Sequence, residues 1–78
     1  MLRNFEVLEM LNKKYGIKIE SVQKLNKIYN QLGLIEKKGN DWIQTDLGMT
    51  FCPSKVKFYR ANEWKETIVD YLASHLRY

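Results

Sequence analysis

The fold of this chain is decided by residues 21–48, whose sequence is SVQKLNKIYNQLGLIEKKGNDWIQTDLG. Ser21 is a good N-cap for a helix, since its hydroxyl can accept a free amide of the first turn. The apolar residues that follow recur at helical spacing and form one stripe, consisting of Val22, Leu25, Ile28, Tyr29 and Leu32. Gly33 comes next, where a helix commonly ends in a left-handed residue. The pattern predicts a helix over residues 21–32.

A β-hairpin is predicted directly after this helix. Residues 34–38 read as one strand, Gly39-Asn40 as the turn, and residues 41–45 as the return strand. A helix followed by a hairpin is the order of the recognition helix and wing in a winged helix-turn-helix. We therefore expect a winged helix-turn-helix-like α+β domain with two N-terminal helices, a hairpin wing and a C-terminal helix.

The first helix is predicted over residues 2–15. Its apolar side chains are expected on one face, namely Phe5, Leu8, Leu11 and Tyr15, with Val7 at the margin. Met10 falls outside this stripe and is expected at the surface or against a partner. Gly16 ends the helix, and a short extended link leads to Ser21, so two helices are joined by a turn of a few residues.

Three further elements are predicted after the hairpin. Thr45 or Asp46 is expected to cap one helical turn over residues 47–51, and residues 56–60 alternate like a strand that pairs beside the hairpin. The last helix is predicted over residues 62–77, capped by Asn62. Its apolar face is broad, comprising Trp64, Ile68, Val69, Tyr71, Leu72, Ala73, His75 and Leu76. Such a face either completes the core between the hairpin and the first helix or packs against a second chain, through Tyr71, Leu72, His75 and Leu76.

Composition indicates one folded domain over residues 1–78, with 45% hydrophobic and 28% charged residues. There is no apolar run long enough to span a membrane and no signal-peptide pattern, so we expect a cytoplasmic protein. The single cysteine, Cys52, cannot form an internal disulfide. His75 and Cys52 have no partners at spacings that would support catalysis or metal binding, so neither an enzyme nor a cofactor or metal site is expected. Trp42 is expected in the core under the hairpin, and Trp64 is expected in the core or at an interface.

The charge pattern points to nucleic acid. The net charge is +4, from 13 Lys and Arg against 9 Asp and Glu, which permits DNA binding without requiring it. The polar face of the 21–32 helix carries no acid and consists of Gln23, Lys24, Asn26, Lys27, Asn30 and Gln31. These side chains can bond phosphates or base edges, while Lys37, Lys38 and Asn40 of the hairpin would hold the DNA backbone. A solvated surface is the competing interpretation, and Asp41, which can pair with Lys38, favours it slightly.

Residues 25–48 also resemble the short winged-helix segment of phage antirepressors and other small prophage DNA-binding proteins. The features in common are Leu25-Asn26, Leu32-Gly33-Leu34, Lys37-Lys38, Trp42 and Thr45-Asp46-Leu47-Gly48. The resemblance covers about a third of the chain and implies a small regulator of transcription or replication that binds double-stranded DNA. The alternative is a protein-interaction module that uses the same scaffold to bind and modulate a host protein.

Overall fold

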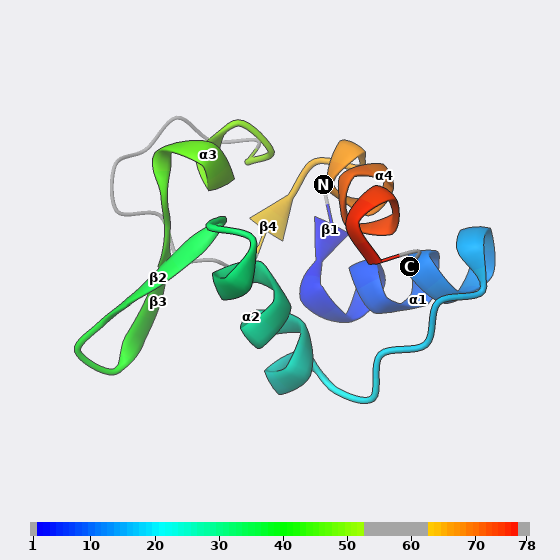
Figure 1. The fold of residues 1–78 in the computed structure, drawn as a ribbon, viewed down its shortest axis with the longest axis horizontal. Coiled ribbons are helices and arrows are strands. Elements are labelled where there is room, and N and C mark those ends of the chain that lie inside the picture. Colours follow the sequence, from blue (N-terminus) through cyan, green and yellow to red (C-terminus); the bar gives the residue numbers. More distant parts are fainter. Residues whose placement is uncertain (1, 53–62, 77–78) are drawn as a thin grey trace.

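The computed structural model describes residues 2–52 and 63–76. These residues form four helices and two small antiparallel sheets, so the chain is a small α+β domain (Figure 1). In chain order the elements are β1 (Leu2–Arg3), α1 (Asn4–Tyr15), α2 (Val22–Gln31), β2 (Ile35–Lys38), β3 (Asp41–Gln44), α3 (Asp46–Met49), β4 (Glu63–Trp64) and α4 (Thr67–Leu76). The strand predicted at 56–60 and the cap predicted at Asn62 lie outside the described residues.

The predicted helix–hairpin unit is confirmed. Ser21 Oγ accepts a hydrogen bond from the Lys24 amide at 3.2 Å and so caps α2. Gly33 has φ = +75°, a backbone conformation that a residue with a side chain rarely adopts, and it turns the chain from α2 into β2. β2 and β3 then pair in antiparallel register, with Lys38 opposite Asp41 across the turn.

Two hydrogen bonds of Thr45 connect the end of α2 to the start of α3. We call Thr45 together with Gly48 the Thr45–Gly48 clasp. The Thr45 hydroxyl accepts a hydrogen bond from the Gly48 amide at 3.1 Å and donates one to the Gly33 carbonyl at 2.5 Å. A Cβ atom on Gly48 would lie 1.9 Å from the carbonyl oxygen of Leu34, so only glycine lets α3 pack this closely. Of the two predicted caps for this turn, the structure selects Thr45.

The predicted starts of the first and last helices are wrong. Residues 2–3 and 63–64 are strands that pair antiparallel, Leu2 opposite Trp64 and Arg3 opposite Glu63, so α1 begins at Asn4 and α4 only at Thr67. Within β4, Trp64 is fully buried whereas Glu63 is only half-buried, as expected for side chains on opposite faces of a strand. The sequence pattern was misleading because Trp64 and Ile68 are four residues apart, a spacing that also fits one helix face.

The buried face of α1 also differs from the prediction. Val7 and Leu11 are fully buried, whereas Phe5 is 55% exposed. The reason is the direction of the Asn4 side chain, which faces the buried residues. Val7 and Leu11 lie three and seven positions after Asn4 and share its helix face, whereas Phe5 is rotated by about 100° from that face. Met10 is partly buried and packs against the core rather than standing free.

Asn4 connects three parts of the core. Its Oδ1 atom accepts hydrogen bonds from Trp64 Nε1 at 3.0 Å and from the Tyr29 hydroxyl at 3.4 Å. The rings of Tyr29 and Trp64 lie 4.7 Å apart between centroids, and both side chains are fully buried, so the expectation that Trp64 is a core residue is confirmed. Burial raises the pKa of the Tyr29 hydroxyl, which therefore stays protonated as a donor.

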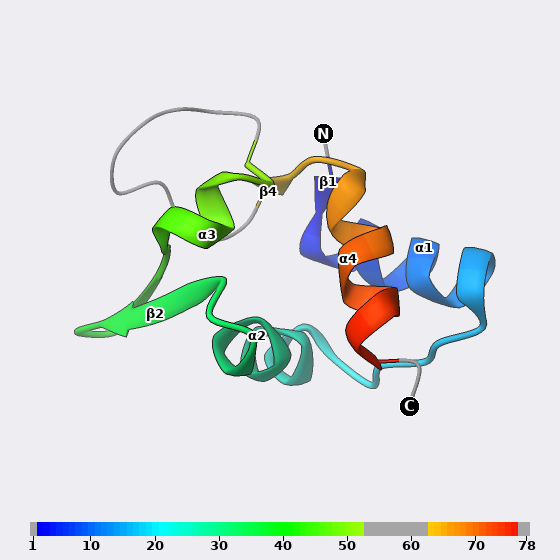
Figure 2. The same cartoon turned by 45° about the horizontal axis from the view of Figure 1, so that its top comes forward.

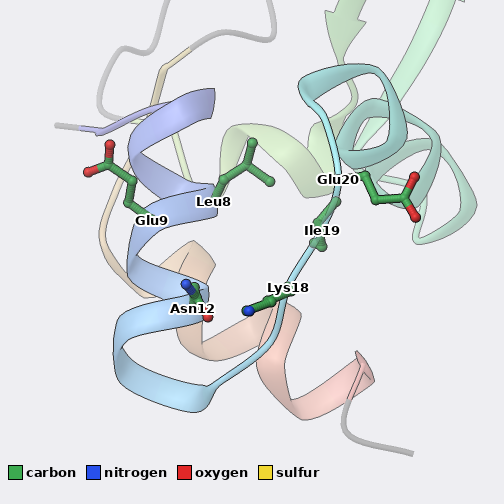
Figure 3. Close-up of a pocket in the computed structure, with 6 residues that line it drawn as sticks. All are labelled: Leu8, Glu9, Asn12, Lys18, Ile19 and Glu20. Atoms are coloured by element: carbon green, nitrogen blue, oxygen red, sulfur yellow. The ribbon is translucent and has the colours of Figure 1, made fainter.

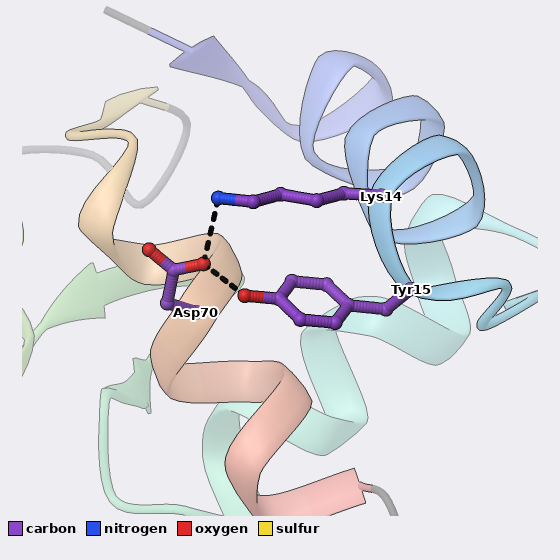
Figure 4. A network of polar contacts seen from close by, with 3 residues as sticks. All are labelled: Lys14, Tyr15 and Asp70. Atoms are coloured by element: carbon purple, nitrogen blue, oxygen red, sulfur yellow. Dashed lines mark hydrogen bonds and ion pairs between the residues drawn. The ribbon is translucent and has the colours of Figure 1, made fainter.

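Helix α4 packs on α1, and a polar network marks their exposed edge (Figure 4). Asp70 Oδ1 accepts hydrogen bonds from the Tyr15 hydroxyl and from Lys14 Nζ, the latter at 3.0 Å. The bond from Tyr15, followed by the bond from Lys14, lowers the pKa of the Asp70 carboxyl below its ordinary value.

We predict that Asn4→Ala lowers the free energy of unfolding by about 2 kcal/mol, because buried donors on Trp64 and Tyr29 lose their acceptor. Urea denaturation followed by circular dichroism measures the change. The control is Asn12→Ala, at an exposed asparagine of the same helix, which should change the free energy by less than about 0.5 kcal/mol. Equal losses in the two variants would contradict the role given to Asn4.

A second prediction concerns the stability of the folded protein at low pH. Because the folded-state pKa of Asp70 lies below the ordinary value of 3.8, its stabilising contribution is complete above that value and is lost as the pH falls through the folded-state pKa. The difference in unfolding free energy between wild type and Asp70→Asn should therefore shrink on acidification. Tyr15→Phe should show the same trend more weakly. Parallel pH profiles for wild type and Asp70→Asn would rule the network out as a source of acid sensitivity.

Candidate nucleic-acid interface

The outward face of α2 is a polar, basic surface. Leu25 and Tyr29 are fully buried on the opposite side of the helix. The residues exposed on the outward side are Gln23, Lys24, Lys27, Asn30 and Gln31, and α2 itself contains no Asp or Glu. We call these five side chains the α2 face. Two lysines can neutralise phosphates, and the three amides can each donate and accept a hydrogen bond at a base edge.

Asn26, the sixth residue predicted here, lies elsewhere. It is half-buried at the border between the polar and apolar sides of α2, and its Oδ1 atom is shielded from solvent and has no hydrogen-bond partner. A shielded oxygen cannot reach a base edge without movement of the side chain. The structure therefore separates Asn26 from the α2 face.

An acid from outside α2 lies at the edge of this surface, although α2 itself has none, as expected. Glu20 precedes the N-cap, and its Oε1 atom lies 3.6 Å from Lys24 Nζ. Both side chains are exposed, so the pair itself adds little to stability. The pair has an electrostatic consequence, because Glu20 partly offsets the positive charge of Lys24 at the N-terminal end of the α2 face. Lys27 lies nearer the C-terminal end of the helix.

The hairpin extends from the C-terminal end of α2 and projects away from α1 and α4 (Figure 1). The three residues predicted to hold the DNA backbone, Lys37, Lys38 and Asn40, are all exposed on it. Lys37 Nζ lies 5.6 Å from the centroid of the Trp42 ring, a cation–π distance. Trp42 is half-buried and packs against the core, rather than being a fully buried core residue.

The Glu20–Lys24 and Lys37–Trp42 contacts were not predicted from the sequence, although the residue spacing indicates both. Glu20 and Lys24 have the i, i+4 spacing of a helical ion pair. Lys37 and Trp42 are equally far from the turn, which places them opposite each other in the register.

Most of the residues predicted to form a dimer interface instead pack within the same chain. Leu72 is fully buried in the core between the helices, so it is not available to a second chain. Leu76 is half-buried and packs on the same core. Tyr71 stacks between Phe51 and His75, with ring centroids 4.7 and 4.5 Å away, and only His75 of the four is well exposed. The apolar face of α4 is wide because it completes the monomer core with Ile68, Val69, Leu72 and Ala73.

A shallow hollow of about 370 Å³ lies between α1 and the link to α2 (Figure 3). Leu8 and Ile19 point into it, and the remaining lining residues are Glu9, Asn12, Lys18 and Glu20. The carboxylate of Glu20 turns outward, away from Leu8. Within residues 2–52 and 63–76, no three His, Cys, Asp or Glu side chains come together as a metal site, and Cys52 is buried. None of the helices in this part of the chain is long and apolar enough to cross a membrane.

The fold and this surface define a small α+β domain with an exposed polar helix face that is followed by a hairpin carrying Lys37 and Lys38. Comparison of the chain with protein-family models, curated proteins and solved structures finds no match.

Proposed function

We propose that the protein binds double-stranded DNA through the α2 face and the hairpin, as a small regulator of transcription or replication of the phage or prophage type. In this proposal α1 and α2 form a helix-turn-helix, α2 is the recognition helix and β2–β3 is the wing. The observation that carries it is the α2 face: five exposed Lys, Asn and Gln side chains on a helix without an acid.

The chemistry of this surface suits a duplex. Lysines bind phosphates and supply affinity, while Asn and Gln can form paired hydrogen bonds with adenine in the major groove. A helix of 10 residues is about 15 Å long, enough for one face to follow a few base pairs in the groove. The hairpin starts at the end of α2, so its lysines would lie over the adjoining backbone.

The alternative function, binding of a host protein, would favour an exposed apolar patch. Among the described residues the exposed large hydrophobic side chains are Phe5 and Leu47, at 55% and 42%. They belong to α1 and α3 respectively and not to the helix–hairpin surface. The described surface therefore supports a nucleic-acid partner better than a protein partner.

The proposal predicts binding to random-sequence duplex that weakens steeply with salt, because each neutralised phosphate releases counterions. The double variant Lys24→Ala/Lys27→Ala should bind more weakly, and the slope of log affinity against log salt should fall by about 1 to 2. Fluorescence anisotropy of a labelled duplex measures both quantities.

The matched control for this experiment is Lys13→Ala/Lys65→Ala, which removes the same charge from exposed lysines outside α2 and the hairpin. It should leave most of the affinity intact. If both double variants lose affinity equally, net charge rather than the α2 face explains binding. If the wild-type protein shows no binding at low salt, the proposal fails.

Glu20 offers a test with the opposite sign. Glu20→Gln should raise affinity for duplex DNA by about 2- to 5-fold at low salt, because it removes a carboxylate next to phosphate and releases Lys24. The gain should disappear as salt is added. Glu66→Gln, which makes the same charge change at an exposed residue near α4, is the control and should gain much less. A loss of affinity in Glu20→Gln would contradict DNA contact at this end of α2.

A further inference from the structure

The two faces of the hairpin differ in chemistry. Side chains alternate along each strand, and the register places Ile35 opposite Gln44, Lys37 opposite Trp42, Glu36 opposite Ile43, and Lys38 opposite Asp41. One face therefore carries Ile35, Lys37, Trp42 and Gln44, and we call it the Lys37–Trp42 face. The other carries Glu36, Lys38, Asp41 and Ile43, and we call it the Lys38 face. The two adjacent lysines lie on opposite sides of the hairpin.

The Lys37–Trp42 face is continuous with the core. Ile35 and Gln44 are buried at the base of the hairpin, Trp42 is half-buried against the core cluster, and Lys37 is exposed beyond them. The core cluster includes Leu25 and Tyr29, on the buried side of α2, so this face is on the side of the hairpin toward which α2 packs. It carries no acid between residues 35 and 44.

The Lys38 face has acidic surroundings. Glu36 and Asp41 lie on it, with Asp41 directly opposite Lys38. Toward the base it borders a second hollow of about 290 Å³, which Asp46 and Met49 of α3 also line. Helices α2 and α3 lie on opposite sides of the start of β2 (Figure 2), so this face is turned toward α3 and away from α2.

We propose that the hairpin holds the sugar–phosphate backbone of the duplex through its Lys37–Trp42 face, with Trp42 as the positioning residue for Lys37, and that the Lys38 face is turned away from DNA. This inference rests on the proposed function and specifies the part of the wing that performs it. It adds Trp42 to the interface and removes Lys38 from it.

Two physical arguments support the choice of face. A phosphate approaching Lys38 meets the carboxylates of Glu36 and Asp41, whereas one approaching Lys37 meets no acid on that face. The indole ring also attracts the ammonium group at the observed 5.6 Å, which restricts the lysine side chain before binding and reduces the entropy lost when it engages a phosphate.

The decisive comparison is Lys37→Ala against Lys38→Ala, which change the net charge equally at neighbouring positions. Anisotropy titrations with a random duplex should show at least a 5-fold loss of affinity for Lys37→Ala, from about one lost phosphate contact, and a salt slope smaller by about 0.9. Lys38→Ala should lose less than about 2-fold, as expected for a lysine that makes no phosphate contact.

Trp42 gives an independent readout, because the other tryptophan, Trp64, is fully buried. Duplex DNA should reduce acrylamide quenching of the intrinsic fluorescence, and this protection should be absent from Trp42→Leu, which keeps an apolar side chain against the core. Lys37→Ala should also cost less in the Trp42→Leu background than in wild type, since the ring no longer positions the ammonium group. A purely structural role for Trp42 would give neither DNA-dependent protection nor this coupling.

The outcomes separate the two proposals. Equal losses for Lys37→Ala and Lys38→Ala, or a larger loss for Lys38→Ala, overturn the choice of face while leaving DNA binding through α2 in place. Absence of duplex binding by the wild-type protein overturns both. If Trp42→Leu does not fold, the comparison of the two lysine variants still decides the inference.

Discussion

One carboxamide oxygen, Oδ1 of the half-buried Asn4, connects three elements of the fold. Asn4 Oδ1 accepts hydrogen bonds from the indole N–H of Trp64 and from the hydroxyl of Tyr29, and so connects the start of α1, the strand before α4 and the last turn of α2. The indole N–H of Trp64 and the hydroxyl of Tyr29 are buried donors, and leaving such a donor without an acceptor costs stability, so the contact favours having all three residues in place together. The rotation of α1 that directs Asn4 to this contact also places Val7 and Leu11 in the core and leaves Phe5 exposed. Burial of Leu25 and Tyr29 leaves the opposite side of α2 in contact with solvent.

Local pattern was sufficient for the central part of the fold. Ser21, Gly33 and the turn at Gly39 mark boundaries through their own backbone chemistry, and the structure places α2 and the hairpin where they predict. The pairing of residues 2–3 with 63–64 could not be found this way, because it joins distant segments too short to show a period. The hydrogen bonds of Asn4 to Trp64 and Tyr29 could not be found either, since an asparagine at the start of a helix ordinarily suggests a surface residue.

The candidate surface could also be predicted in part from local sequence pattern. Exposure of five side chains on α2 follows from helical geometry alone once the apolar stripe is known. The departures are at its margins: Asn26 is half-buried because it borders the stripe, and Glu20 reaches Lys24 from outside the helix. Leu72 is buried because α4 supplies the monomer core, a role that the width of an apolar face cannot distinguish from an interface. Sequence thus identifies a face, whereas its edges depend on tertiary contacts.

The Thr45–Gly48 clasp has a consequence for how this domain can vary. One hydroxyl closes the chain between Gly33 and α3, so the two ends of the hairpin are held together at its base independently of what lies between them. Residues can then be added to or removed from the tip in opposing pairs, preserving the alternation of faces, without altering the packing of α2 or α3. The glycine at position 48 has no such freedom, because a side chain there would collide with Leu34. The base of the hairpin is therefore sterically restricted at Gly48, whereas its length can change in steps of one residue pair.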